Sequence, residues 1–417
     1  MFLGGAAPGG RAEPTAGRNA VRAGPAGPRR GVGGGGAPAA GRLALDTEFM
    51  GEGRYRTLLC LVQLAIPEDE GLDEHILVVD PLVDDFDGSA LAGVLADPAI
   101  EIVVHAGRQD MALLRRCLST DVTNVFDTQV AAGFAGLGAQ VGYDSLLSEV
   151  LGLRVAKTAS FTRWDARPLS PEQVAYARED VVHLLELASE LERRLEQLGR
   201  LQWAREECEP LARSSDERTL ESVFARLPRV TALNASARPV ARELVRWRER
   251  AAERNDRPVQ SVLGDATLVE IAKRRPSSKG ELEKIRGVGN TGGRRADELL
   301  EAIRIGREHP PDPPGESTRP PAPKPDDAPL IALGEALLRT RAREAGLAYE
   351  LLAARADLQA IVTAARLGDE EADVRTLRGW RRELAGAELL ELLNGGVSLS
   401  VHETSEGRRV KIGDAHR

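Results

Sequence analysis

The sequence is poor in cysteine, contains no long apolar run and lacks a phosphate-binding loop, and each absence excludes a class of protein. Its three cysteines, Cys60, Cys117 and Cys208, share no short spacing, which argues against a disulfide framework and against a zinc site. No run of about eighteen apolar residues occurs, so we expect no membrane span. The dipeptide Gly-Lys is absent, so the sequence has no loop of the kind that cradles nucleoside triphosphates.

The first residues of the chain predict neither a signal peptide nor a folded element. Residues 1–10 lack the basic start and the continuous apolar run of a signal peptide, and we expect a cytoplasmic location. Residues 1–41 are dominated by Gly, Ala and Pro, can bury almost nothing and are predicted to be disordered. A translation start assigned too far upstream would also produce such a segment. The length of 417 residues predicts two to three domains, and the 42% hydrophobic content can supply their cores.

Acidic residues in three separate segments are the most informative feature that the sequence does contain. Asp46 and Glu48 lie on a short apolar strand, where residues two apart point to the same side. Asp110 follows a second apolar strand. Tyr176 and Asp180 lie in a helical pattern, where residues four apart share a face. Burying such acids unpaired would be costly, so the pattern indicates a functional site.

Four converging acids predict bound divalent cations. Like charges close together repel strongly, so the carboxylates cannot all stay ionised at low cost. A pair of cations relieves that repulsion, and oxygen ligands without His or Cys suit Mg2+ or Mn2+ rather than zinc. His105 and His183 are assigned to packing or to a supporting role, not to a metal. Two ions roughly 4 Å apart form a known clamp for in-line displacement at phosphorus.

The segments that carry these acids resemble the 3′–5′ exonucleases named for four invariant acids, and within them the ribonuclease D family. The resemblance is carried by residues 45–49, by 104–111, and by 157–169 together with 176–180. It covers roughly 42–205 and implies an α/β ribonuclease-H-like exonuclease domain, a mixed sheet flanked by helices. Strands are expected at 43–48, 58–66, 76–80 and 101–106, and helices near 88–96, 110–118, 144–151 and 171–198.

The resemblance also implies roles for individual residues. Asp46, Glu48, Asp110 and Asp180 would bind two Mg2+ or Mn2+ ions, and Tyr176, four positions before the last acid, indicates the tyrosine subgroup. Tyr176 would orient the attacking water and help to remove its proton. Three further residues are candidates for substrate binding, through charge for phosphate or stacking for a base: they are Lys157, Trp164 and Arg167. For Trp164 a packing role is an equally good interpretation.

The rest of the chain predicts helical modules that bind nucleic acid. Residues 208–308 contain a stripe of arginines and a Gly287-Val-Gly289 turn, and they resemble the helicase-and-ribonuclease-D C-terminal (HRDC) domain. The net charge of −8 is awkward for such a partner, but a local basic surface decides binding, and a merely solvated arginine face remains the alternative. A proline-rich linker at 309–327 precedes a second, divergent HRDC-like region at 328–400, and 401–417 is predicted to be a loose tail.

These features together favour a monomeric, metal-dependent 3′–5′ exoribonuclease that acts on single-stranded RNA 3′ ends, with tRNA precursors as the substrates that family membership suggests. A helicase is disfavoured by the missing triphosphate loop. A non-catalytic RNA-binding scaffold is disfavoured because all four acids and the tyrosine are present. An exonuclease that acts on DNA stays open, because recognition of the 2′-hydroxyl cannot be read from the sequence.

Overall fold

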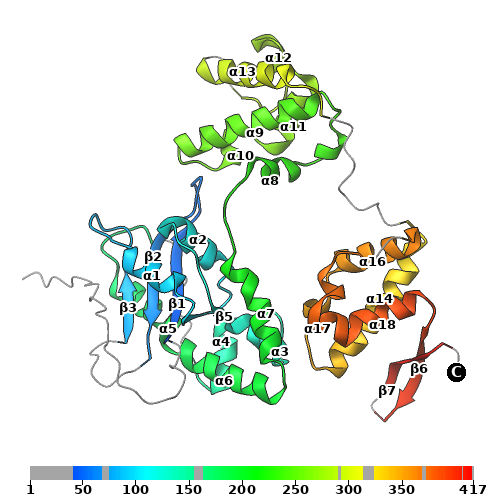
Figure 1. Ribbon diagram of the computed structural model, residues 1–417. Helices are drawn as coiled ribbons and strands as arrows, with labels where there is room; N and C mark the ends of the chain where they lie inside the picture. The colour runs from blue at the N-terminus through cyan, green and yellow to red at the C-terminus, as the bar shows by residue number, and fades with distance from the viewer. Residues whose placement is uncertain are drawn as a thin grey trace, which may run out of the picture.

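The computed structural model describes residues 41–67, 75–154, 163–289, 293–312, 324–368, 372–405 and 407–415. Three parts follow one another along the chain, an α/β part, a helical part and a second helical part that ends in a hairpin (Figure 1). The predicted disorder of 1–41 lies outside the described residues except for Gly41, which begins the first strand. In the described ranges, no helix combines the length and the apolarity that a membrane span requires.

A five-stranded mixed sheet forms the centre of the first part, and it confirms the predicted fold class. Its strands lie in the order β3-β2-β1-β4-β5. They are β1 (Gly41–Met50), β2 (Leu58–Ala65), β3 (Ile76–Val79), β4 (Ile100–Val104) and β5 (Val125–Asp127). The central strand β1 runs antiparallel to β2 and parallel to β4. The pairing of β1 with β2 shifts register between Glu48 and Phe49, a bulge of the kind that re-aims side chains.

Helices cover both faces of this sheet. They are α1 (Ser89–Ala96), α2 (Arg108–Leu118), α3 (Thr128–Phe134), α4 (Tyr143–Leu146) with a π-helical turn (Leu147–Leu151), α5 (Pro171–Val182), α6 (Leu184–Gln197) and α7 (Leu201–Ala212). Strand alternation divides the core, because Leu43 and Leu45 pack on the side of α2 whereas Ala44 packs with the leucines of α6. The sequence did not predict β5 and α3, which are short.

An ion-pair network fastens the start of β1 to the neighbouring elements. Arg42 and Arg205 each contact both Glu101 of β4 and Glu192 of α6, with N–O distances of 2.7 Å for all four pairs. Both guanidinium groups also lie over the ring of Phe126. Because four charges are paired in one closed set, the network holds β1 in place where the acidic residues follow.

The second part is all helical, as the sequence predicted. Its helices are α8 (Leu220–Ala225), α9 (Ala237–Arg254), α10 (Val259–Val262), α11 (Asp265–Arg274), α12 (Lys279–Glu283) and α13 (Arg294–Glu308), with a 3-10 turn at Val230–Ala232. Helices α9 and α13 approach so closely that a Cβ atom on Gly306 would lie 2.5 Å from the Cα of Val240. Only glycine permits that crossing. Gly287 and Gly289 both adopt positive φ angles, as expected for a tight turn.

The third part is helical up to residue 393 and then forms a β-hairpin. It contains α14 (Asp327–Glu344), α15 (Tyr349–Leu352), α16 (Arg355–Leu367), a 3-10 turn (Arg375–Leu377), α17 (Gly379–Arg381), a π-helical turn (Arg382–Gly386), α18 (Ala387–Leu393), β6 (Val397–Thr404) and β7 (Gly407–Asp414). The prediction of a loose tail at 401–417 is therefore wrong for the residues of the hairpin. Apolar residues alternate along both strands, which is the strand pattern that the prediction overlooked.

Aromatic packing joins the third part to the first. The indole of Trp380 stacks on that of Trp203, with ring centroids 5.1 Å apart and planes 15° from parallel, and meets Phe134 edge-on. Arg381 forms an ion pair with Glu207 of α7 beside this stack. Trp380 is only 4% exposed and belongs to the same apolar cluster as the leucines of α6. The third part therefore shares a core with the sheet domain.

We expect Trp380→Ala to lower the free energy of unfolding by about 3 kcal/mol or more, because the side chain is buried between the two parts. Chemical denaturation followed by circular dichroism measures the change. Trp380→Phe keeps one aromatic ring against Phe134 and should cost clearly less. Equal stability of the alanine variant and the unmodified protein would show that the two parts do not depend on each other.

Candidate active site

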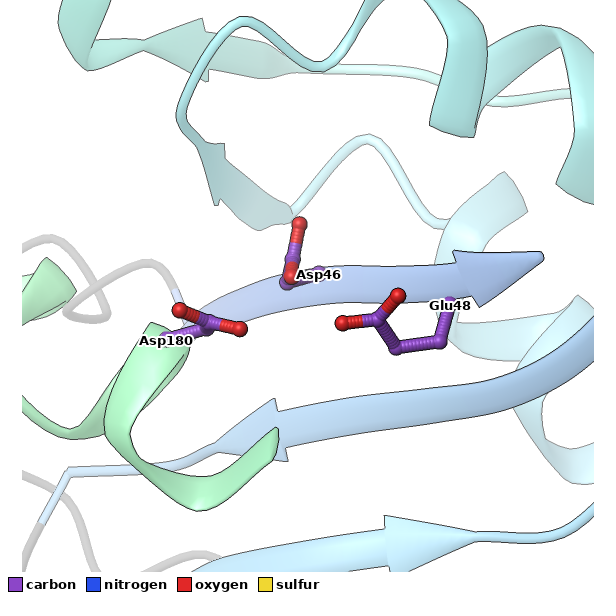
Figure 2. A group of neighbouring side chains, drawn as sticks. All are labelled: Asp46, Glu48 and Asp180. Atoms are coloured by element: carbon purple, nitrogen blue, oxygen red, sulfur yellow. The ribbon is translucent and has the colours of Figure 1, made fainter. Parts of the chain in front are cut away.

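Strand β1 and helix α5 bring three acidic side chains together. Asp46 and Glu48 project from the same side of β1, and Asp180 reaches them from the C-terminal half of α5 (Figure 2). One carboxylate oxygen from each residue lies within 4.8 Å of the other two. The carboxylates of Glu48 and Asp180 extend toward each other beside Asp46. Strand alternation predicted that Asp46 and Glu48 share one side of β1, and the family resemblance implied that Asp180 joins them.

Helix α5 begins at a capping box, as the sequence predicted. The backbone N–H of Gln173 donates to the Ser170 hydroxyl at 3.2 Å, and the Ser170 N–H donates to Gln173 Oε1 at 2.9 Å. Pro171 occupies the first helical position. Because this end is fixed, Tyr176 and Asp180 lie one turn apart on a helix with a defined start.

Asp110 is buried on α2 and is not a member of the group of three carboxylates. The hydroxyl of Thr47 donates to Asp110 Oδ1. Thr47 lies between Asp46 and Glu48 on β1, so strand alternation turns it to the opposite face, toward α2. Asp110 thus approaches the site from the other side of the strand, and its negative charge still acts on both Asp46 and Glu48.

Asp127, which the sequence analysis did not single out, fixes the turn that leads to Asp110. Its carboxylate accepts from the backbone N–H groups of Ala106 at 3.1 Å and Gly107 at 2.9 Å, and it also caps α3 by accepting from Gln129 at 2.8 Å. Gly107 tolerates no side chain, because a Cβ would lie 2.6 Å from Val104 Cγ2. The signal in the sequence was an aspartate at the junction of an apolar strand and a helix, a typical N-cap.

Burial and mutual repulsion raise the pKa values of the clustered carboxyls. Burial raises the pKa of Glu48 to about 8, with added repulsion from Asp180 and Asp110. Burial, followed by the charges of Asp144 and Glu179, raises the pKa of Asp180 to about 7. The pKa of Asp46 is also raised well above its usual value, mainly by burial. Without a cation, the site therefore favours protonated acids, as expected for closely spaced carboxylates.

Tyr176 lies on the same helix as Asp180 and packs its ring against Trp164, with centroids 6.0 Å apart. Burial, with the charges of Asp180, Glu48 and Asp46, raises the pKa of its phenol to about 12. The hydroxyl is therefore neutral near pH 7. It is suited to orient a water molecule by hydrogen bonding and is a poor general base.

Arg167, a predicted substrate-binding residue, is engaged by protein acceptors in this structure. Its five N–H groups are all directed at protein acceptors: Asp80 accepts twice at 2.6 Å, Cys60 O accepts at 2.8 Å, and the carbonyls of Trp164 and Ala166 accept at 2.7 and 2.8 Å. A guanidinium group offers five donors, so none remains for a phosphate. Arg167 instead ties the segment before α5 to the end of β3.

Trp164 is also structural in this conformation. It is 3% exposed and packs with Cys60, Leu61 and Ala177, so no ring face is open to a base. These contacts favour the packing interpretation of Trp164, and base stacking stays a prediction. Lys157, the third candidate for substrate binding, lies outside the described residues.

The two histidines near the acids, His105 and His183, contact neighbouring side chains of the exonuclease domain. His105 Nδ1 lies 3.0 Å from the Thr128 hydroxyl, and its ring packs against Tyr143. His183 lies at the junction of α5 and α6, with Nδ1 3.8 Å from Glu186. Neither belongs to the carboxylate group.

Several arginines of the predicted basic stripe form ion pairs within the second part. Arg248 is 1% exposed and pairs with Asp265 at 2.6 Å. Arg238 and Arg242 both pair with Asp312, at 2.9 and 2.6 Å, and lie over the ring of Phe224. The stripe is therefore partly internal, which neither the nucleic-acid interpretation nor the solvated-face interpretation anticipated.

Comparison with known proteins identifies the family. The sequence profile of a 3′–5′ exonuclease family matches residues 37–196, and that of the HRDC domain matches residues 237–303. Ribonuclease D of Gluconacetobacter diazotrophicus is 38% identical over 377 residues, which cover 88% of this chain and 91% of that protein. The chain belongs to the ribonuclease D family. It is a 3′–5′ exoribonuclease of that family, with an exonuclease domain followed by a helical HRDC region.

Two further relatives agree with this assignment. Ribonuclease D of Acidiphilium cryptum is 36% identical over 381 residues, which cover 89% of this chain and 92% of that protein. The crystal structure of Escherichia coli RNase D, described as an exoribonuclease involved in structured RNA processing, superposes with a TM-score of 0.72. It is 27% identical and covers 85% of this chain and 94% of its own. The ribonuclease D architecture thus extends over most of the chain.

The clustered side chains fit the divalent cations that the family implies. All three offer carboxylate oxygens, and no His or Cys belongs to the group. Hard oxygen donors of this kind suit Mg2+ or Mn2+. The raised pKa values show that the protein holds these oxygens close at an electrostatic cost that a cation would offset.

We expect the metal-free protein to lose stability as the pH rises from about 4 to about 8. In this window the folded protein keeps protons on Glu48 and Asp180 that the unfolded chain has already released, so the free energy of unfolding falls with pH. Thermal melting in EDTA across this range tests the slope. Glu48→Gln should flatten it, and Mg2+ should raise the melting temperature more at pH 8 than at pH 6. A slope that is unchanged in Glu48→Gln would contradict the assignment.

Proposed function

We propose that this exoribonuclease hydrolyses single-stranded RNA 3′ ends with two divalent cations, Mg2+ or Mn2+, held by Asp46, Glu48, Asp110 and Asp180. The observation that supports this most directly is the convergence of three of these carboxylates within 4.8 Å, with raised pKa values. Asp110 completes the proposed set from the side of α2, where the Thr47 hydroxyl donates to one of its carboxylate oxygens. The catalytic domain is taken as 42–205, with helical domains at 208–308 and 328–400.

The residues of the site divide the work of hydrolysis. When bound, two cations would lower the pKa of the attacking water and stabilise the charge of the departing oxygen. Asp46 and Glu48 supply oxygens at a spacing fixed by β1, and Asp180 closes the site from α5. The neutral hydroxyl of Tyr176 orients the water for in-line attack. The acids are half-buried, which reduces the screening of these interactions by bulk water.

The proposed substrate is the 3′ end of a structured RNA precursor, of which tRNA precursors are the example suggested by the family. The Escherichia coli relative is described as acting in structured RNA processing, and its architecture covers most of this chain. The three cysteines are free, which agrees with the reducing cytoplasm proposed as the location. Preference for RNA over DNA requires contacts to the 2′-hydroxyl, and the experiment below measures it directly.

The test compares matched RNA and DNA strands, each labelled at the 5′ end and carrying either a free or a blocked 3′ end. We expect shortening from free 3′ ends of RNA that requires Mg2+ or Mn2+. Asp46→Asn should lower turnover by roughly a hundredfold or more, because it weakens the binding of cations that stabilise transition-state charge.

Glu196→Gln, which removes an exposed acid at the far end of α6, is the matched control and should keep full activity. Near-normal turnover of Asp46→Asn at saturating Mg2+ would refute the proposed site. Equal rates on RNA and DNA would favour a general exonuclease. Tight RNA binding without any shortening would favour the scaffold alternative.

Tyr176→Phe separates water orientation from packing, because it removes the hydroxyl and keeps the ring. We expect kcat to fall by ~10²–10⁴-fold, the range typical of groups that assist proton transfer. RNA affinity and the Mg2+ concentration for half-maximal activity should change little. Tyr349→Phe, in the third part, is the control. If Tyr176 only packs, the substitution should cost about 1 kcal/mol of stability and leave kcat unchanged.

A further inference from the structure

The C-terminal hairpin is an element whose two faces differ sharply in chemistry. β6 and β7 pair antiparallel over eight residues each, and the ribbon projects from the helices of the third part (Figure 1). β6 contacts α18, and β7 contacts α14. At roughly 3.3 Å per residue the ribbon is about 25 Å long. It extends past the helical core, since Val401 near its middle is 70% exposed.

One face of the ribbon rests on the helical core. Leu399 and Ile412 are cross-strand partners and pack against the apolar cluster of α14, α16 and α18. The same face carries the pair of Val401 with Val410 and, near the turn, the pair of Glu403 with Arg408. The acidic side chains of the paired strands, Glu403 and Asp414, both belong to this face by strand alternation.

The opposite face carries two cationic side chains, hydroxyl groups and the imidazole of His402. By the same alternation it presents Lys411 opposite Ser400, Arg409 opposite His402, and Ser398 next to the helices. Lys411 and His402 are exposed, and Arg409 is half-buried. Arg409 and Lys411 are two residues apart on one strand, so their side chains project in parallel, roughly 7 Å apart. Within the paired strands, no carboxylate interrupts this face.

We propose that this outward face of β6–β7, defined by Ser398, Ser400, His402, Arg409 and Lys411, binds the phosphate backbone of a duplex stem in the RNA substrate. The inference rests on the proposed function, because it supposes an RNA whose 3′ strand enters the carboxylate site while its folded portion remains outside. Charge complementarity supports the choice of partner: parallel cations flanked by hydroxyls match a row of phosphate oxygens.

The composition of the ribbon favours a duplex over a single strand. Surfaces that bind single strands use aromatic side chains on which bases stack, and residues 397–415 contain no Phe, Tyr or Trp. Duplex RNA is recognised mainly through shape and backbone contacts, which a polar ribbon without stacking groups can supply. Binding of this kind is independent of base sequence and depends strongly on salt.

The experiment uses the full-length protein in EDTA, so that RNA is bound but not cut. Two ligands are compared by fluorescence anisotropy at several salt concentrations: an RNA hairpin with a single-stranded 3′ extension, and the extension alone. The test variant is Arg409→Gln with Lys411→Gln. The matched control is Arg408→Gln, which removes a cation of the same strand from the opposite face.

We expect the double variant to bind the RNA hairpin roughly tenfold more weakly. The slope of the logarithm of the association constant against the logarithm of the salt concentration should become shallower by about 1.5 to 2. Affinity for the extension alone should be unchanged, and Arg408→Gln should behave as the unmodified protein. Unchanged hairpin affinity and salt slope in the double variant would refute the proposal. An equal loss in Arg408→Gln, or an equal loss on the single strand, would also refute it.

A separate assay keeps this result distinct from the proposed function. All variants are given Mg2+ and a short unstructured RNA, and each should shorten it at the same rate, because the ribbon contributes nothing to the carboxylate site. If the unmodified protein fails to shorten this RNA, the proposed function is overturned. The binding experiment in EDTA still decides whether the ribbon binds duplex RNA, because it does not depend on cleavage. Circular dichroism and thermal melting verify that the variants are folded.

Discussion

Electrostatic repulsion among carboxylates is the constraint on which the catalytic part depends. β1 sets the separation of Asp46 and Glu48, and α5 delivers Asp180, so that three acidic groups share one small volume. Burial and mutual repulsion raise their pKa values, which means that the fold maintains an arrangement that is unfavourable without a cation. A flexible site would relax by moving the acids apart. The surrounding structure must therefore be stiff, and its buried polar contacts supply this stiffness.

Those contacts lead to the elements that carry the acids. Arg42, at the start of β1, is tied to β4 and α6 by ion pairs, and Asp127 fixes the turn before α2 with its carboxylate. Arg167 secures the segment before α5 with all five donors. The hydrogen bonds to Asp127, and those from Arg167 to the carbonyls of Cys60 and Trp164, are buried or half-buried, where hydrogen bonds to charged groups are worth more than at the surface. Arg167, a predicted substrate ligand, thus helps to position the helix that carries Tyr176 and Asp180.

The two helical parts are attached to the sheet domain in different ways. The third part shares an apolar core with it through Trp203 and Trp380. The second part meets the β1–β2 turn through polar contacts, Arg54 with Asp256 at 2.9 Å and the Tyr55 hydroxyl with Glu249 at 3.1 Å. Exposed charged contacts of this kind are screened by salt, whereas buried indoles are not. The basic face of the hairpin is therefore carried on the part that is fixed to the catalytic domain by its core.

Residue spacing by itself placed Asp46 and Glu48 on one side of a strand, and Tyr176 and Asp180 on one face of the capped helix α5, because the repeat of a strand or helix decides which side chains share a face. The mixed sheet and the meeting of these acids were implied by the family resemblance. The sequence also determined the positive-φ turn at Gly287 and Gly289. Tertiary structure alone decided the rest. Whether Arg167 or Trp164 faces substrate or core depends on partners about a hundred residues away, Cys60 and Asp80 among them, and no local pattern encodes them. The same holds for the placement of Asp110 beside Thr47, for the burial of Arg248, and for the union of Trp203 with Trp380, since each contact is made only when distant segments pack together.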